Sequence, residues 1–150
     1  MADVRLSGHG VTIDVPDGWE ARIYQRGGGA PVLHVATFGL EAQDGDFGAA
    51  ATGRMRPDDT FAALVQYRTD ARLRPGAGLF AAAGAPAPRA AEFGPRQLQV
   101  MRPGHLGWQR FFTERGRPCC LYAVIQPAQQ TPEALVARLE QVLVTVRLEP

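Results

Sequence analysis

The chain has 150 residues, a length that suits one domain able to bury roughly 70% of its unfolded surface without disulfides or metal ions. Its net charge of +1 argues against a dedicated polyanion-binding protein, and no apolar run approaches the ~20 residues that a helix needs to span a bilayer. All 16 basic residues are arginine, which a GC-rich coding sequence explains and which therefore says little about nucleic acids.

The N-terminal part predicts short strands. Val4–Ser7 begins a first strand, and Val11–Val15 forms a second because its apolar residues alternate with Thr12 and Asp14. Pro16 ends this strand, since it has no backbone N–H, and Trp19 follows a turn and fills an edge of the core. We interpret 21–26 as the second arm of a hairpin with Val11–Val15.

The middle of the chain predicts one strand, a loop and a helix. Residues 32–40 have strong β character, and residues 41–53 resemble a surface loop. A helix is predicted to begin at Asp58, Asp59 or Thr60, because Phe61, Leu64, Val65 and Arg68 follow at helical spacing. Residues 72–95 are rich in Ala, Gly and Pro and predict a long connection, with a helical turn near 79–83.

The C-terminal third gives the clearest pattern. After a strand at 97–101, residues 106–114 and 118–126 predict a β-hairpin around Arg115-Gly116-Arg117. The second arm is apolar on both faces, so we expect helices to cover both sides of the sheet. A last helix is predicted to begin after Thr131, with Pro132 in its first turn and a stripe of apolar side chains: Leu135, Val136, Leu139, Val142, Leu143 and Val146.

No residue pattern typical of catalysis or metal binding stands out. His9, His34 and His105 lie dozens of residues apart, without the short spacing of metal ligands. Cys119 and Cys120 are adjacent, so on a strand they face opposite sides, and an apolar strand makes a thiol unreactive. The glycine-rich stretches lack the strand–turn–helix setting of nucleotide-binding loops. We therefore expect neither an enzyme nor a cofactor.

The order of these elements resembles the PsbP-like superfamily, and within it the DcrB-like domains, which include Eag-type chaperones of type VI secretion effectors. The resemblance rests on Val15-Pro16-Asp17-Gly18-Trp19, on the hairpin at 107–126, and on the final helix at 135–147. It implies a single domain over residues 1–150 in the α+β class. This domain would be an α/β/α sandwich, with a curved, mainly antiparallel sheet flanked by helices.

The resemblance also implies a non-catalytic role. We expect a cytoplasmic, secretion-associated chaperone or adaptor that binds an apolar or membrane-spanning segment of a client protein without itself entering a membrane, in a form compatible with a homodimer. The candidates for partner binding are Trp108, Arg110, Phe112, Arg54 and Arg72, although the aromatic residues Trp108, Phe111 and Phe112 also suit a core.

Two other functions stay open at this point. One is a small-molecule (anion) binding domain or enzyme with a pocket near residues 72–95, in which Arg54, Arg72, Arg74 or His105 holds the anion. The other is nucleic-acid binding through a basic patch of arginines between 54 and 74. The near-neutral net charge and the lack of interleaved aromatic residues disfavour the second.

Overall fold

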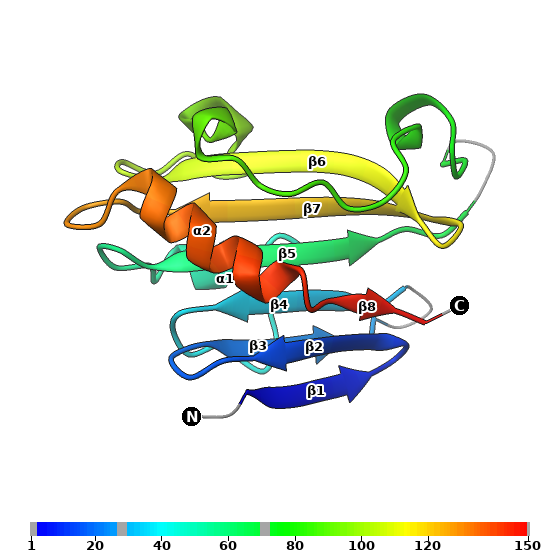
Figure 1. The fold of residues 1–150 in the computed structure, drawn as a ribbon, viewed down its shortest axis with the longest axis horizontal. Helices are drawn as coiled ribbons and strands as arrows, with labels where there is room; N and C mark the ends of the chain where they lie inside the picture. The colour runs from blue at the N-terminus through cyan, green and yellow to red at the C-terminus, as the bar shows by residue number, and fades with distance from the viewer. Residues whose placement is uncertain (1–2, 27–29, 70–72, 150) are drawn as a thin grey trace.

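A five-stranded antiparallel sheet forms the centre of the protein (Figure 1). The computed structural model describes residues 3–26, 30–69 and 73–149. The strands of this sheet, in spatial order, are β3 (Glu20–Tyr24), β4 (Val32–Ala36), β5 (Thr60–Gln66), β7 (Arg117–Ile125) and β6 (Leu106–Glu114). Each strand pairs antiparallel with its neighbours.

A second layer covers one face of this sheet. It consists of helix α2 (Pro132–Leu143) and a small antiparallel sheet of β1 (Val4–Gly8), β2 (Val11–Val15) and β8 (Arg147–Leu148), in the order β1-β2-β8 (Figure 1). Because β8 follows α2 directly and pairs with β2, it joins the helix and the small sheet into one layer. The principal core lies beneath this layer and includes Leu64, Trp108 and Leu139.

On the other face of the central sheet, the described residues form no comparable helix layer. The core on this face, which contains Phe61, Tyr122 and Val124, is covered by Phe38, Phe47, Met55 and the four-residue helix α1 (Ala49–Thr52). The sheet-rich antiparallel fold is therefore confirmed, but the expected α/β/α sandwich is not. Strand β7 is buried on both faces, as predicted, yet irregular segments perform the covering that a second helix layer would perform.

The helix predicted to start at 58–60 is wrong, because Thr60–Gln66 forms strand β5. Apolar residues at Phe61, Leu64 and Val65 fit helical spacing, but all seven residues of β5 are buried. A strand between two others, covered on both faces, needs a continuous apolar run rather than alternation, so its pattern imitates a buried helix.

Of the other predicted strands and helices, some are wrong and some are confirmed. Residues 21–26 do not pair with Val11–Val15: β3 pairs with β4, whereas β2 pairs with β1 and β8. The strand predicted at 97–101 is absent, because a 3-10 turn (Pro95–Gln97) and bends occupy that region. The hairpin β6–β7 and the capping of α2 are confirmed, with the Thr131 side chain accepting from the backbone N–H of Ala134. Trp19 is half-buried against the principal core.

The long connection between β5 and β6 carries two further 3-10 turns, Gly78–Phe80 and Ala90–Glu92. It leaves the edge of β6, crosses the face that carries α2 and returns to β6 (Figure 1). The predicted long connection, with a helical turn near residues 79–83, is thus confirmed for the part that the structure describes, whereas the turn at Ala90–Glu92 was not predicted.

Candidate functional site

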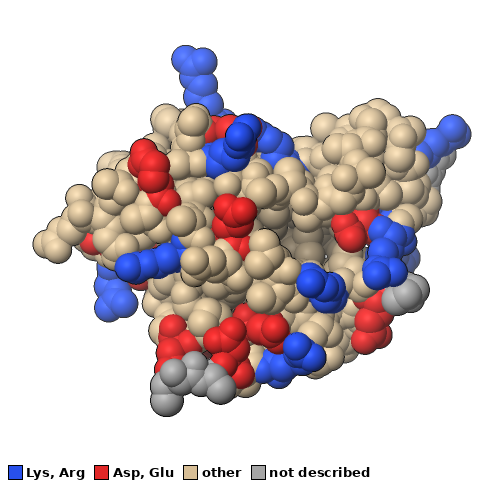
Figure 2. All heavy atoms as spheres, viewed as in Figure 1, with Lys and Arg blue, Asp and Glu red and all other residues tan. Residues whose placement is uncertain are grey.

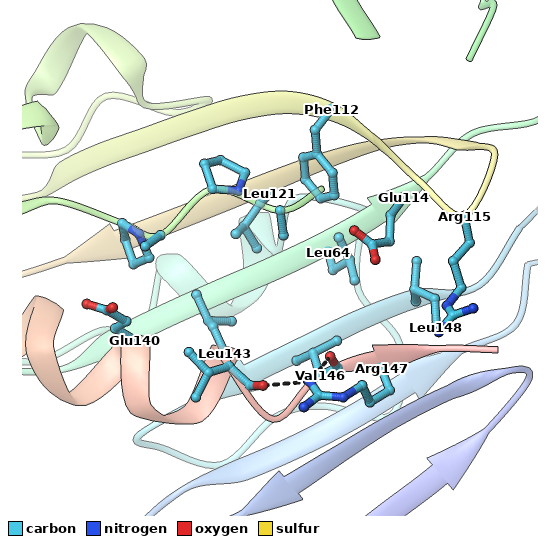
Figure 3. A pocket seen from close by; sticks show the side chains of 15 residues that line it. Leu64, Phe112, Glu114, Arg115, Leu121, Glu140, Leu143, Val146, Arg147 and Leu148 are labelled. Carbon is cyan, nitrogen blue, oxygen red and sulfur yellow. Dashed lines mark hydrogen bonds between the residues drawn. The ribbon is translucent and has the colours of Figure 1, made fainter. Parts of the chain in front are cut away.

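A groove with a volume of about 490 Å³ opens between α2–β8 and the connection segment Ala85–Pro88, which we call the strap (Figure 3). Its floor is apolar and comes from the central sheet: Leu64 on β5, Leu121 on β7 and Phe112 on β6. Leu143, Val146 and Leu148 form the wall on the α2–β8 side. The groove therefore joins segments that are far apart in the sequence.

Backbone hydrogen bonds to β6 fix the start of the strap. The amide of Gly84 donates to the carbonyl of Thr113 at 2.8 Å, and the amide of Thr113 donates to the carbonyl of Ala82, also at 2.8 Å. Pro86 and Pro88 then prevent the strap from continuing as a regular strand, because they have no backbone N–H. The strap consequently leaves β6 and crosses the sheet as an extended, unpaired segment.

A polar network fixes the chain beyond the strap. Glu92 accepts from the indole N–H of Trp108 at 3.0 Å and forms an ion pair with Arg110 at 3.3 Å. Phe93 stacks on the Trp108 ring, with 6.0 Å between centroids, and Arg110 lies over the same ring. The indole hydrogen bond, followed by the charge of Arg110, lowers the pKa of Glu92.

Four charged side chains surround the groove: Glu114, Arg115, Glu140 and Arg147. Arg147 donates to the carbonyls of Val144 and Val146, at 2.6 and 2.9 Å. Glu114, Arg115 and Glu140 form no side-chain hydrogen bond or ion pair with any other described residue. Figure 2 shows acidic and basic residues interspersed over this face, so the groove has a rim of mixed charge rather than a field of one sign.

Neither of the two cysteines lines the groove. The nearby thiol of Cys119 is buried in the principal core, and burial raises its pKa to about 12, which keeps it protonated and unreactive. Burial likewise raises the pKa of Cys120 to about 12 on the opposite face of β7. Within residues 3–26, 30–69 and 73–149, no group of three or more His, Cys, Asp or Glu side chains is arranged to hold a metal ion.

The four predicted partner-binding residues that the structure describes do not converge on one surface. Trp108 is 0% and Phe112 1% exposed, so both belong to the core, although Phe112 also forms part of the groove floor. Arg110 is engaged with Glu92 and Gln97. Arg54 lies by the other core, where it donates to the Gly39 carbonyl at 2.7 Å. Arg72 lies outside the described residues.

The anion-holding residues of the alternative prediction are also dispersed. His105 is buried beside an open apolar hollow formed with Met101 and Pro103, away from the groove, and Arg74 is exposed before the strap. The pocket near residues 72–95 does exist, because the strap lines the groove, but its arginines are Arg115 and Arg147. The alternation of Ala and Pro at 85–88 is the signal in the sequence that points to this segment.

Comparisons with protein-family profiles, curated proteins and solved structures found no match to this chain. Among the helices of the described residues, none combines the length and apolar character needed to cross a membrane.

Proposed function

We propose that this protein is a non-catalytic binding module whose groove holds an apolar segment of a client protein. The observation that supports it is the character of the groove, whose floor is apolar and whose charged residues stand at the rim. A binding site of this kind gains affinity from the buried apolar floor and orientation from the polar rim.

The role that fits such a module is that of a chaperone or adaptor in the cytoplasm. The proposed membership of the PsbP-like superfamily, in its DcrB-like branch, agrees with this role. The antiparallel sheet, the Pro16-to-Trp19 strand end and the β6–β7 hairpin followed by α2 support that membership. A client with an exposed apolar segment would need such a partner before it reaches its membrane or secretion machinery.

One observation favours a second candidate, a small-molecule binding protein. The groove volume of about 490 Å³ lies within the roughly 300–1,000 Å³ of typical ligand sites, and Arg115 stands at its rim without a partner among the described residues. A ligand with an apolar body and an acidic group would fit this arrangement. The two candidates differ in the mass of what occupies the groove.

Site-specific photo-crosslinking in the native host separates the two candidates. A photoreactive amino acid replaces Val144, which lines the groove and is 58% exposed, or Leu79, which is 61% exposed and does not line it. We expect the Val144 position to give a covalent adduct with one protein, and the Leu79 position to give none. The groove variant Leu143→Glu should suppress the adduct, because it places a charge on the apolar wall.

Equal protein adducts at both positions would contradict the proposal, as would an adduct that survives Leu143→Glu. A small-molecule adduct at Val144, in the absence of any protein adduct, would establish the second candidate instead. Circular dichroism of each variant, recorded before crosslinking, checks that a lost adduct does not reflect a lost fold.

A further inference from the structure

We infer that the groove takes its occupant as an extended polypeptide segment that pairs with the free edge of β8 and adds a fourth strand to the small sheet. This inference rests on the proposed function, because it specifies how a client segment is bound. It arises from two observations: the unpaired edge of β8 and the charges at the two ends of the groove.

Among the strands that the structure describes, β8 has a partner on one side only. It pairs with β2 through Val11↔Leu148 and Thr12↔Arg147, and it is the last strand in the order β1-β2-β8. The groove is lined by Val146, Arg147 and Leu148 but by no residue of β2, so it lies along the other side of β8. Figure 3 shows β8 running along this side of the groove.

Hydrogen-bonded pairs alternate along β8, and this alternation leaves the backbone N–H and C=O of Leu148 without a partner on β2. The amide of Glu149 donates to the carbonyl of Gly10 at 2.8 Å, which makes Gly10 and Glu149 a hydrogen-bonded pair in the same register. Such pairs alternate in an antiparallel ladder, so Arg147 also bonds to β2. The N–H and C=O of Leu148 therefore point away from β2, toward the groove.

The strap does not satisfy this edge. Pro86 and Pro88 have no N–H, and the strap forms its backbone hydrogen bonds with β6 just before it reaches the groove. An unpaired strand edge over an apolar floor is a template for another extended chain, in the manner of β-augmentation.

The backbone of Leu148, rather than the size of the groove, favours a strand over a helix. A helix 10–12 Å wide occupies about 420–610 Å³ per turn, so the groove would hold about one turn. An extended chain occupies about 160 Å³ per residue at strand spacings of 3.3, 4.8 and 10 Å, so about three residues fit. The volume thus admits either form, but an extended chain can hydrogen-bond to the backbone of Leu148, whereas one helical turn would leave that backbone unpaired.

The charged residues at the two ends of the groove indicate which residues lie on either side of the bound segment. Glu140 lies on α2 at the end where the chain enters β8, and Arg115 lies near Leu148 at the other end (Figure 3). Neither has an ion-pair partner among the described residues. A segment that runs antiparallel to β8 therefore carries a basic residue at its C-terminal end, beside Glu140, and an acidic residue at its N-terminal end, beside Arg115. The second preference is the weaker one, because the carboxylate of Glu114, also without a partner among the described residues, lies at the same end as Arg115 (Figure 3).

The test uses synthetic peptides and the full chain. The probe is an acetylated, amidated peptide Asp-Leu-Thr-Leu-Lys with a fluorescent label on a short Gly-Ser linker, and fluorescence anisotropy measures its binding. Single N-methylation of each of the three central residues removes one backbone donor at a time. Alternate donors face β8 in a strand, so we expect methylation of the Thr to weaken binding at least tenfold. Methylation of either Leu should change binding less than twofold.

Protein variants localise the binding. Leu143→Glu, in the groove wall, should weaken the peptide at least tenfold, whereas Val4→Glu should leave it unchanged, because Val4 is 67% exposed on β1. Exchanging the Asp and Lys of the peptide should weaken binding by about two- to fivefold, the range of a rim ion pair, and Arg115→Glu should remove that preference.

Several results would overturn the inference: no binding at millimolar peptide, equal effects of all three N-methyl groups, or loss of binding in Val4→Glu. If the Val144 crosslink still captures a client under any of these outcomes, the proposed function stands and only the extended, β8-paired mode is excluded. If the Val144 crosslink captures no client and the peptide does not bind either, the proposed function itself is contradicted.

Discussion

At the scale of single residues, close packing decides which positions tolerate change. Gly48 has a φ of 67°, and a Cβ atom there would lie 2.1 Å from the buried ring of Phe61. Gly45, three residues earlier, has open space around the corresponding position. The two glycines occupy the same loop, so they form a matched pair.

We predict that Gly48→Ala destabilises the protein by about 1–3 kcal/mol or more, since it adds both backbone strain and a clash with Phe61. Gly45→Ala should change stability by less than about 0.5 kcal/mol. Urea denaturation of the two variants measures the difference. Equal midpoints would show that Phe61 is not packed against residue 48.

Buried histidines give the protein a specific pH dependence. His34 is fully buried on β4, with its Nε2 atom 2.9 Å from the Asp46 carbonyl and its Nδ1 atom without a partner among the described residues. Burial lowers the pKa of His34 below the ordinary value of 6.5, and only part of this effect is offset by the hydrogen bond to Asp46. Burial also lowers the pKa of His105.

These shifts predict that stability falls as pH decreases below 6.5. In that range the unfolded chain takes up protons that the folded chain excludes, so the free energy of unfolding falls, by at most about 1.4 kcal/mol per pH unit for each histidine. The pKa values of Asp14, Asp58 and Glu92 are also lowered, but these carboxyl groups reduce stability only when the pH falls below their ordinary pKa values of 3.8 to 4.5. Urea denaturation between pH 7.5 and 5 therefore isolates the histidines. An unchanged slope in His34→Gln would show that His34 does not contribute.

At the scale of elements, local signals predicted the termini of the chain better than its centre. Thr131 and Pro132 predict the start of α2, because they are suited to cap a helix. Arg115-Gly116 predicts the turn between β6 and β7, where both residues have a positive φ. The apolar pattern of β5 predicts a helix, whereas its identity as a strand depends on β4 and β7, which pair with it from opposite sides. Tertiary pairing overrides a local pattern in such a strand.

Helix α2 offers the clearest element-scale prediction. Leu139 is 0% exposed and packs in the principal core beneath the helix. We expect Leu139→Ala to cost on the order of 2–5 kcal/mol, because it removes buried methyl groups and leaves a cavity. Val144→Ala, just past the same helix, should cost less than about 0.5 kcal/mol, since Val144 is largely exposed. Similar thermal melting curves for the two variants would contradict the packing of α2 on the sheet.

At the scale of the whole molecule, the groove is a product of assembly. Its floor comes from three strands of the central sheet, one wall from the C-terminal α2–β8 segment and the other from the strap. The sequence indicated that residues 72–95 form a connection but not where it crosses the sheet. It also offered no pattern for β8, which has only two residues and is defined by its pairing with β2. Long-range register, rather than local composition, therefore creates the site.

The dependence of the groove on long-range register also explains why the predicted partner-binding residues that the structure describes do not share one surface. The sequence predicts a binding role for the aromatic residues Trp108 and Phe112, yet both are buried in the principal core. Arg115 and Glu140 carry no distinguishing signal in the sequence. They become candidates only because a turn between two strands and a helix end are brought to opposite ends of one groove.

The measurement that tests the central claim most directly is backbone amide hydrogen exchange on the full chain, with and without the client captured through Val144. If the groove holds the client, exchange slows at Leu148 and at Ala85 and Ala87 in the strap, while the outer strand β1 (Val4–Gly8) is unchanged. Slowed exchange along β1, with no change at the strap and β8, would contradict the account and place the client on another surface.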